Sequence, residues 1–274
     1  MKLAHRQTDI HDTNEFSDLQ WISQASGLPG QRAAAAAQPA SATILPLSSG
    51  NRTKSVTHAM PVLNREQEAN FEALAGNLID ASLDKGTRVL TVTSAAPRQG
   101  TSTIVYFLAL KLAQKQDGRN GKNSVLIIDA NSRRPAQHTF FRLGQQAGLA
   151  RIRLTNPNGG NANEQSELFV LTSRLSPAGW RTFIESGKFS FMLKKLQAEF
   201  DYILIDAPSV LGNPDTVVVS QATDGVLLVV HNNPLRRDVV AAARQELEDN
   251  NVTILGVVFN NHIGAAAIHK NYRQ

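Results

Sequence analysis

Residues 89–104 read VLTVTSAAPRQGTSTI, a β-branched apolar run that leads through a short Pro/Gly loop into an apolar-periodic segment. A strand, loop and helix in this order is typical of a phosphate-binding loop, in which backbone N–H groups at a helix start face an anion. The usual pattern is G-x-x-x-x-G-K-[ST]. Gly100 and Ser102 keep the second glycine and the hydroxyl, whereas Ala95 replaces the first glycine and Thr101 replaces the lysine. The stretch predicts an anion cradle without its usual positive charge.

The composition of the chain excludes several classes of protein. Its 274 residues, 42% of them hydrophobic, are enough for one large α/β domain with additional segments. Because it has no cysteine, disulfide frameworks and cysteine-ligated metals are excluded. The net charge of +5 is modest and its basic residues are scattered, which favours a solvated surface over nucleic-acid binding. No apolar run approaches the ~20 residues of a membrane-spanning helix, and we expect no signal peptide.

The chain is predicted to have three regions. Residues 1–60 are predicted to be flexible, because Ser26–Ala59 is rich in Ala, Ser, Pro, Gly and Gln. Within them, Asp9–Ser23 has a helical apolar spacing and is either a docking helix for a partner or part of a disordered tail. Residues 61–264 are predicted to form the domain, and residues 265–274 a short tail.

Apolar runs and helical stripes alternate through residues 88–260, which predicts an α/β fold with a doubly wound, mostly parallel sheet of the P-loop NTPase type. Residues 136–166 carry no clear pattern. The predicted strands are 88–93, 124–130, 168–172, 202–206, 225–230 and 253–259, and the predicted helices are 64–83, 102–116, 189–200 and 237–249.

Two of the predicted strands end in an acid, Asp129 and Asp206. Ligands of doubly wound sheets bind outside the carboxyl ends of the strands. We therefore expect both carboxylates to lie beside the loop, where they are the candidate catalytic residues.

The region from about residue 64 to 261 resembles the cytoplasmic domain of bacterial tyrosine kinases (BY-kinases), P-loop proteins of exopolysaccharide and capsule synthesis related to the Min and Par ATPases. The family loop T-S-x-x-P-x-x-G-K-S-T matches residues 93–103 except at the lysine. The family motif D-x-D-x-R-R-P matches residues 129–135, with Asn131 in place of the second acid.

Two further motifs carry the resemblance. The family motif D-Y-[apolar]-I-D-x-P is intact at residues 201–208, and the ending G-V-V-F-N is present at residues 256–260. The resemblance implies that ATP or ADP binds at the loop, with Asn260 beside the base. It also implies that Ser102, Asp129 and Asp206 hold Mg²⁺. The residues expected to bind the nucleotide are Pro97, Arg98, Gln99, Gly100, Thr101, Ser102, Thr103 and Asn260.

The sequence departs from the family pattern in its working parts. Ala69, Glu72 and Ala75 stand where the family has the E-x-x-R-x-x-R motif that builds its rings, so a ring-type homo-oligomer is not expected. The family's cluster of tail tyrosines is reduced to Tyr272. Thr101 offers a neutral hydroxyl in place of a charge-assisted contact, so nucleotide binding is expected to be weakened.

These departures predict a degenerate, pseudokinase-like member with weak or no catalysis. It would be a cytoplasmic regulatory partner in the biosynthesis or export of a surface polysaccharide such as capsule or holdfast. It would reach the inner membrane through a polysaccharide co-polymerase or export protein. One alternative is an active ATPase or tyrosine kinase of the same pathway. Another is a Par- or Min-like positioning ATPase, although Ser94 and Ala95 stand where the Par loop has its early lysine.

Overall fold

The computed structural model describes residues 54–59, 61–115, 123–144, 148–155, 167–172, 175–231 and 237–260. The predicted docking helix, most of the predicted linker and the tail with Tyr272 lie outside these ranges. Nothing in the described part tests those three predictions.

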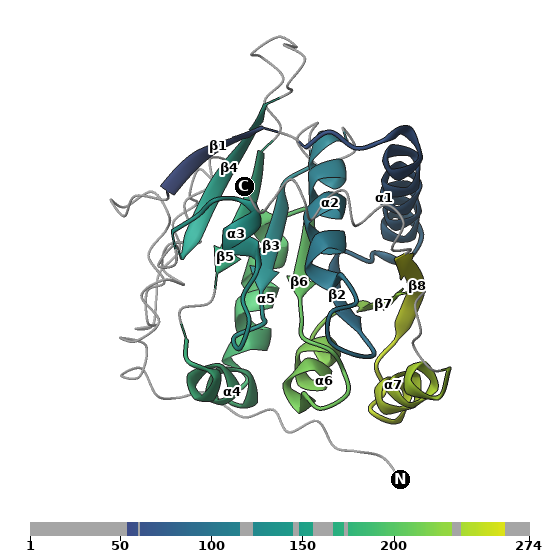
Figure 1. The fold of residues 1–274 in the computed structure, drawn as a ribbon. Helices are drawn as coiled ribbons and strands as arrows, with labels where there is room; N and C mark the ends of the chain where they lie inside the picture. Colours follow the sequence, from purple (N-terminus) through teal and green to yellow (C-terminus); the bar gives the residue numbers. More distant parts are fainter. Residues whose placement is uncertain are drawn as a thin grey trace, which may run out of the picture. The chain divides into compact units, whose positions relative to one another are not determined.

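The described residues contain one eight-stranded sheet with the order β1-β4-β5-β3-β6-β2-β7-β8 (Figure 1). Strands β5, β3, β6, β2, β7 and β8 are parallel to one another. Strand β4 runs antiparallel to β5 and parallel to β1, so this pair forms a reversed edge. The strands are β1 Lys54–Ala59, β2 Val89–Ser94, β3 Val125–Asp129, β4 Leu149–Thr155, β5 Glu167–Thr172, β6 Tyr202–Asp206, β7 Gly225–His231 and β8 Ile254–Asn260.

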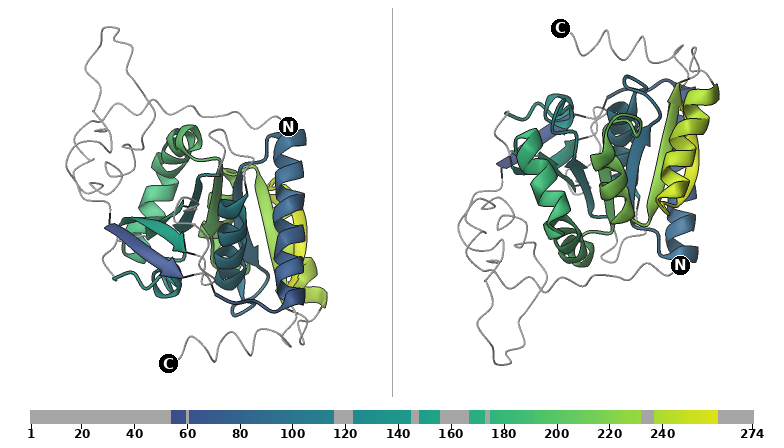
Figure 2. Two further views of the ribbon diagram at one scale, coloured as in Figure 1. Left: turned by 90° about the horizontal axis from the view of Figure 1, so that it is seen from above. Right: turned by 90° about the horizontal axis from the view of Figure 1, so that it is seen from below.

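Helices cover both faces of this sheet (Figure 2). One core cluster joins α1 and α2 to the sheet, and a second joins α6 and α7 to the opposite face. The prediction of a doubly wound, mostly parallel α/β fold is therefore confirmed. The helices are α1 Arg65–Lys85, α2 Thr101–Gln114, α3 Gln137–Phe140, α4 Pro177–Glu185, α5 Lys188–Glu199, α6 Pro214–Gln221 and α7 Arg237–Asp249.

Helix α2 is the most deeply buried helix of the described part, since every residue from 104 to 113 is buried. A helix that is apolar all round needs cover on every side, and α1 packs against one side of α2. The rings of Phe71 and Phe107 lie 5.1 Å apart between the two helices. The buried ammonium of Lys111 pairs with Glu68 and Glu72 of α1. Glu72, one of the departures from the family's ring motif, is thus engaged within its own chain.

The predicted elements from residue 64 onward have counterparts in the structure with end shifts of one or two residues. The structure differs at the start of the domain, because the last six residues of the predicted linker form strand β1. In β1, the His58 ring is buried and its Nε2 lies 2.7 Å from the hydroxyl of Tyr106 in α2. The structure also places β4 and α3 within residues 136–166, where the sequence predicted no element.

Candidate functional site

The loop between β2 and α2 has the backbone of an anion cradle. Arg98 (φ 64°) and Gly100 (φ 85°) both adopt the left-handed conformation, and such a backbone turns successive N–H groups toward one concave side. A left-handed non-glycine residue carries strain of order 1–3 kcal/mol and persists where the surroundings impose it. The first turn of α2 contains no acidic residue, and no side chain caps the helix. The helix dipole at this end is therefore available to a bound anion.

Two neighbouring strands hold the loop in this shape. The buried Gln99 side chain accepts a hydrogen bond of 2.7 Å from the His231 backbone N–H at the end of β7. Asn260, the last residue of β8, donates from Nδ2 to the Gln99 carbonyl at 3.0 Å. A Cβ atom on Gly100 would lie 2.2 Å from Asn260 Nδ2, so only glycine fits there. The structure thus places Asn260 directly against the loop.

The remaining predicted loop residues differ in exposure. Pro97 and Arg98 are exposed, and Thr101, Ser102 and Thr103 are half-buried at the start of α2. The guanidinium of Arg98 therefore faces solvent, and Arg98 contributes to the shape of the loop through its left-handed backbone.

The two strand-terminal acids lie side by side at the edge of the sheet that carries the loop, because Asp129 pairs in register with Asp206. The Asp129 carboxylate accepts backbone N–H groups from Asn131 at 3.2 Å, Ala136 at 2.9 Å and Gln137 at 3.0 Å. Both of its oxygens are engaged in folding the segment that follows β3. Asp206 differs, since its buried Oδ1 has no hydrogen-bond partner among the described residues.

Gln137 belongs to the same site, although the sequence reasoning did not identify it. Its fully buried carboxamide donates from Nε2 to Asp206 Oδ2 at 2.7 Å and to the Ser102 carbonyl at 3.1 Å. Its Oε1 is buried and has no partner in the described part of the chain. This role is visible only in the folded structure, because it depends on contacts that join the ends of two strands to the first turn of α2.

Burial changes the protonation of both acids. Loss of solvation, together with the neighbouring Asp129 charge, raises the pKa of Asp206 to about 7, and the Gln137 amide and the nearby Ser102 hydroxyl oppose this rise. Burial likewise raises the pKa of Asp129 to about 6, and the three backbone donors oppose that rise. Because those donors stabilise the anion of Asp129, Asp206 keeps its proton to higher pH than Asp129 as long as no cation is bound.

Asp206→Asn is expected to change the pH dependence of stability. A carboxyl whose pKa rises on folding stabilises the native state fully below its unfolded value and loses that contribution as pH rises through its folded value. The wild type should therefore lose stability between pH 4 and 7, by at most about 4 kcal/mol from this group. The asparagine variant should show a flatter profile.

Denaturant unfolding with EDTA, from pH 4 to pH 8, measures this difference. The slopes should be compared, because asparagine also changes the contact with the Gln137 amide and this contribution does not vary with pH. Parallel profiles would contradict the assignment of the titration to Asp206.

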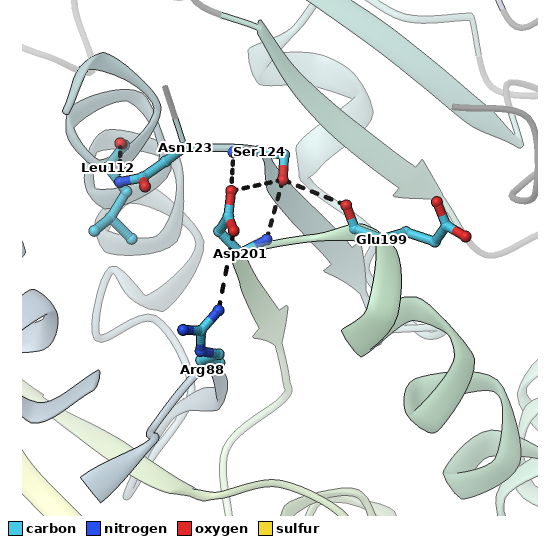
Figure 3. A network of polar contacts seen from close by, with 6 residues as sticks. All are labelled: Arg88, Leu112, Asn123, Ser124, Glu199 and Asp201. Carbon is cyan, nitrogen blue, oxygen red and sulfur yellow. Dashed lines mark hydrogen bonds and ion pairs between the residues drawn. The ribbon is translucent and has the colours of Figure 1, made fainter. Parts of the chain in front are cut away.

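Asp201, the first residue of the third motif, has a structural role at the opposite ends of these strands (Figure 3). Its carboxylate accepts from the backbone N–H and the hydroxyl of Ser124, both at 2.9 Å. Arg88 approaches the same carboxylate at 3.9 Å. This network ties the starts of β2, β3 and β6 together and lies apart from the loop.

The residues at the loop edge fit a divalent cation. The Ser102 hydroxyl and the unpartnered Asp206 Oδ1 are hard oxygen ligands or water acceptors of the kind that Mg²⁺ uses. The described residues contain no group of three His, Cys, Asp or Glu side chains able to hold a metal. A cation here would therefore depend on Ser102 and Asp206, on water and on the phosphates of a nucleotide.

Comparison with known proteins identifies the relatives of this chain. No family model matches its sequence. It is 29% identical over 201 residues to the tyrosine-protein kinase YwqD of Bacillus subtilis, an alignment that covers 72% of this chain and 81% of the relative. It is 28% identical over 217 residues to the tyrosine-protein kinase CpsD of Streptococcus agalactiae, covering 76% of this chain and 89% of CpsD. This chain is a homologue of the bacterial tyrosine kinases.

Solved structures agree with this relationship. The chimerical protein CapA2B2 aligns with a TM-score of 0.57 at 26% identity, over 70% of this BY-kinase homologue and 83% of that protein. The kinase domain of VpsO aligns with a TM-score of 0.57 at 25% identity, over 72% of this chain and 96% of that domain. The resemblance stated from the loop and strand-end motifs is confirmed.

Proposed function

We propose that this BY-kinase homologue is a regulatory protein of surface-polysaccharide biosynthesis or export, and that it binds Mg²⁺ with ATP or ADP weakly and turns ATP over little. The observation that carries the proposal is a neutral Thr101 in a loop whose backbone is otherwise shaped to receive phosphate. Phosphoryl transfer relies on positioning and on stabilising the charge of the transferring group. A site without its lysine loses the second of these contributions.

Among the described residues, neither Arg98 nor Asn131 replaces the missing charge. The Arg98 side chain is exposed. Asn131, which stands at the family's second acid, accepts the Arg134 backbone N–H at 3.1 Å and so serves to shape a turn. Bound Mg²⁺ would neutralise phosphate charge, with Ser102, Asp129 and Asp206 as the residues placed to hold it directly or through water. Nucleotide binding at this site would have a regulatory role, in which the presence of bound nucleotide is the signal, rather than a role in catalysis.

The surface of α1 supports a role as a partner rather than as a ring-forming kinase. Glu68 and Glu72 are engaged with Lys111, and Glu72 also pairs with Lys115. Ala75 is buried in the core. Of the described residues, no helix has the length and apolarity to cross a membrane. We propose that the protein acts on the cytoplasmic side through an inner-membrane polysaccharide co-polymerase or export protein.

A second candidate function is an active kinase or ATPase of the same pathway. The observation that favours it is the pair Asp129 and Asp206, which lies in register beside the loop as chemistry would require. The two candidates differ in whether the cellular role needs turnover.

Replacing the gene in its own host separates them. Deletion is expected to reduce the surface polysaccharide. Asp206→Asn is expected to restore it to near the wild-type amount, because asparagine keeps an oxygen for the cation or its water at this position and the regulatory role needs no turnover. Gly225→Val is a negative control that should disturb the fold and fail to restore the polysaccharide. A Cβ at this position would lie 2.6 Å from the Leu255 side chain and 2.9 Å from the Thr253 carbonyl. Failure of a stably accumulating Asp206→Asn protein would favour the active enzyme. An unchanged amount of surface polysaccharide after deletion would contradict the assignment of this protein to polysaccharide biosynthesis or export.

A further inference from the structure

Gln137 connects three parts of the site. Its backbone N–H binds Asp129 at the end of β3, and its Nε2 binds Asp206 at the end of β6 and the Ser102 carbonyl in α2. Both protons of the amide group are thereby used, and this fixes the orientation of the carboxamide. The opposite atom, Oε1, must then point away from these acceptors.

Two buried oxygens are left without partners at this point, Gln137 Oε1 and Asp206 Oδ1, among the described residues. An unsatisfied buried polar atom typically destabilises a fold by about 1–3 kcal/mol, and such atoms are rare in native structures. The side chains that carry these two oxygens touch each other through Gln137 Nε2 and Asp206 Oδ2, at 2.7 Å, beside the half-buried Ser102. Two unsatisfied oxygens on touching side chains call for a ligand that presents hydrogen-bond donors to both. A hydrated cation does this, because Mg²⁺ usually keeps several of its waters when it binds a protein.

We propose that Gln137 is a positioning residue of the divalent-cation site, and that its Oε1, together with Asp206 Oδ1, accepts hydrogen bonds from water on the cation. The inference rests on the proposed function only in that a cation accompanies the nucleotide. In this chain Asn131 stands in place of the family's second acid, and its Oδ1 accepts a hydrogen bond from the Arg134 backbone N–H. Asn131 Oδ1 is therefore engaged, whereas Gln137 Oε1 has no partner among the described residues.

Two substitutions with opposite expected effects test the role. Gln137→Leu keeps the approximate size of the side chain but removes the acceptor together with the amide donors to Asp206 and Ser102, and it should weaken Mn²⁺ binding by about tenfold. Gln137→Glu keeps an oxygen and adds charge, and it should tighten Mn²⁺ binding severalfold although it places two carboxyl groups side by side without metal. Mn²⁺ is the probe, and its free concentration is measured by electron paramagnetic resonance with and without ADP on the full chain.

Asn123→Leu provides the matched control. Asn123 is a buried amide at the far ends of the strands, where Nδ2 donates to the Leu112 carbonyl at 3.0 Å. Its replacement should lower the unfolding temperature and leave Mn²⁺ affinity unchanged. If Gln137→Leu fails to fold, the comparison of Gln137→Glu with the wild type decides the question alone.

The outcomes separate this inference from the proposed function. Equal Mn²⁺ affinity in the wild type and Gln137→Glu, or no Mn²⁺ site in the wild type, would overturn the role of Gln137. ADP affinity in EDTA is measured in parallel. Binding of ADP without any Mn²⁺ effect would overturn the cation site and the role of Gln137, and it would leave the nucleotide binding and the regulatory role of the proposed function standing. An Mn²⁺ site without ADP binding would remove the nucleotide from the proposed function and support the role of Gln137.

Discussion

Thr101→Lys is expected to tighten the binding of Mg-ATP by roughly tenfold or more. The change places an ammonium at the start of α2, against the position where the loop backbone would hold the phosphates. A new hydrogen bond to a charged group typically contributes about 1.5–3 kcal/mol, and ~1.4 kcal/mol corresponds to tenfold in affinity. The gain needs no refolding, because Arg98 and Gly100 already have the required backbone conformation.

The local structure makes this substitution a clean test. Thr101 is half-buried, and its side chain makes none of the contacts that hold the loop, which come from Gln99 and Asn260. Without an anion, a lysine at a helix N-terminus is slightly unfavourable, by about 0.3–1 kcal/mol. The variant should therefore be marginally less stable alone and more strongly stabilised by ATP.

Thr101→Met is the matched control, since it adds a side chain of similar length without charge. Titration calorimetry with Mg-ATP on the wild type and both variants gives the comparison. Equal affinity of Thr101→Lys and Thr101→Met would mean that added charge does not reach the phosphates. No binding by any of the three would mean that the loop does not accept phosphate at all.

The centre of this fold could be predicted from sequence because its signals are local. Residues 89–104 combine a β-branched run, a Pro/Gly loop and a helical apolar pattern, and each specifies its own structure over a few residues. The positions of Asp129 and Asp206 followed from one geometric rule, that parallel strands present their carboxyl ends at one edge. The structure places both acids and the loop at that edge.

The edge pair β1 and β4 could not be predicted because each strand depends on its neighbours. Strand β1 has few apolar residues, and its half-buried Val56 and buried His58 gain their contacts from α2, from β4 and from Phe141, which directly follows α3. Strand β4 has a period-two pattern in Ala150, Ile152 and Leu154, but polar residues surround it on both sides in the sequence. Burial against distant segments, rather than local propensity, forms these strands.

Gln137 was missed for a related reason. A glutamine after Arg-Arg-Pro-Ala is ordinary in sequence, and its role comes from lying between Ser102 and Asp206, 35 and 69 residues away along the chain. The function of Asp201 was also resolved only by the structure, which separates it from Asp206 by the length of β6.

The rate of ATP hydrolysis is expected to be much lower than that of an ordinary kinase. Under the proposed regulatory function, the neutral Thr101 and the engaged Asn131 would weaken charge stabilisation, and the internally paired acids of α1 would not provide the ring contact of the family. Kinases typically turn over at about 1–100 s⁻¹, and removing one preorganised charge-stabilising donor lowers kcat by about 10²–10³ in enzymes where it has been measured. ATP hydrolysis by this chain is therefore expected to fall well below ~1 s⁻¹.

The most direct measurement is the rate of ATP hydrolysis by the purified full chain with Mg²⁺, together with its self-phosphorylation on tyrosine, beside an Asp206→Ala variant. We expect a rate indistinguishable between the two proteins and no phosphotyrosine on either. Turnover of ~1 s⁻¹ or faster that disappears in Asp206→Ala would contradict the account and identify an active enzyme that works without the loop lysine.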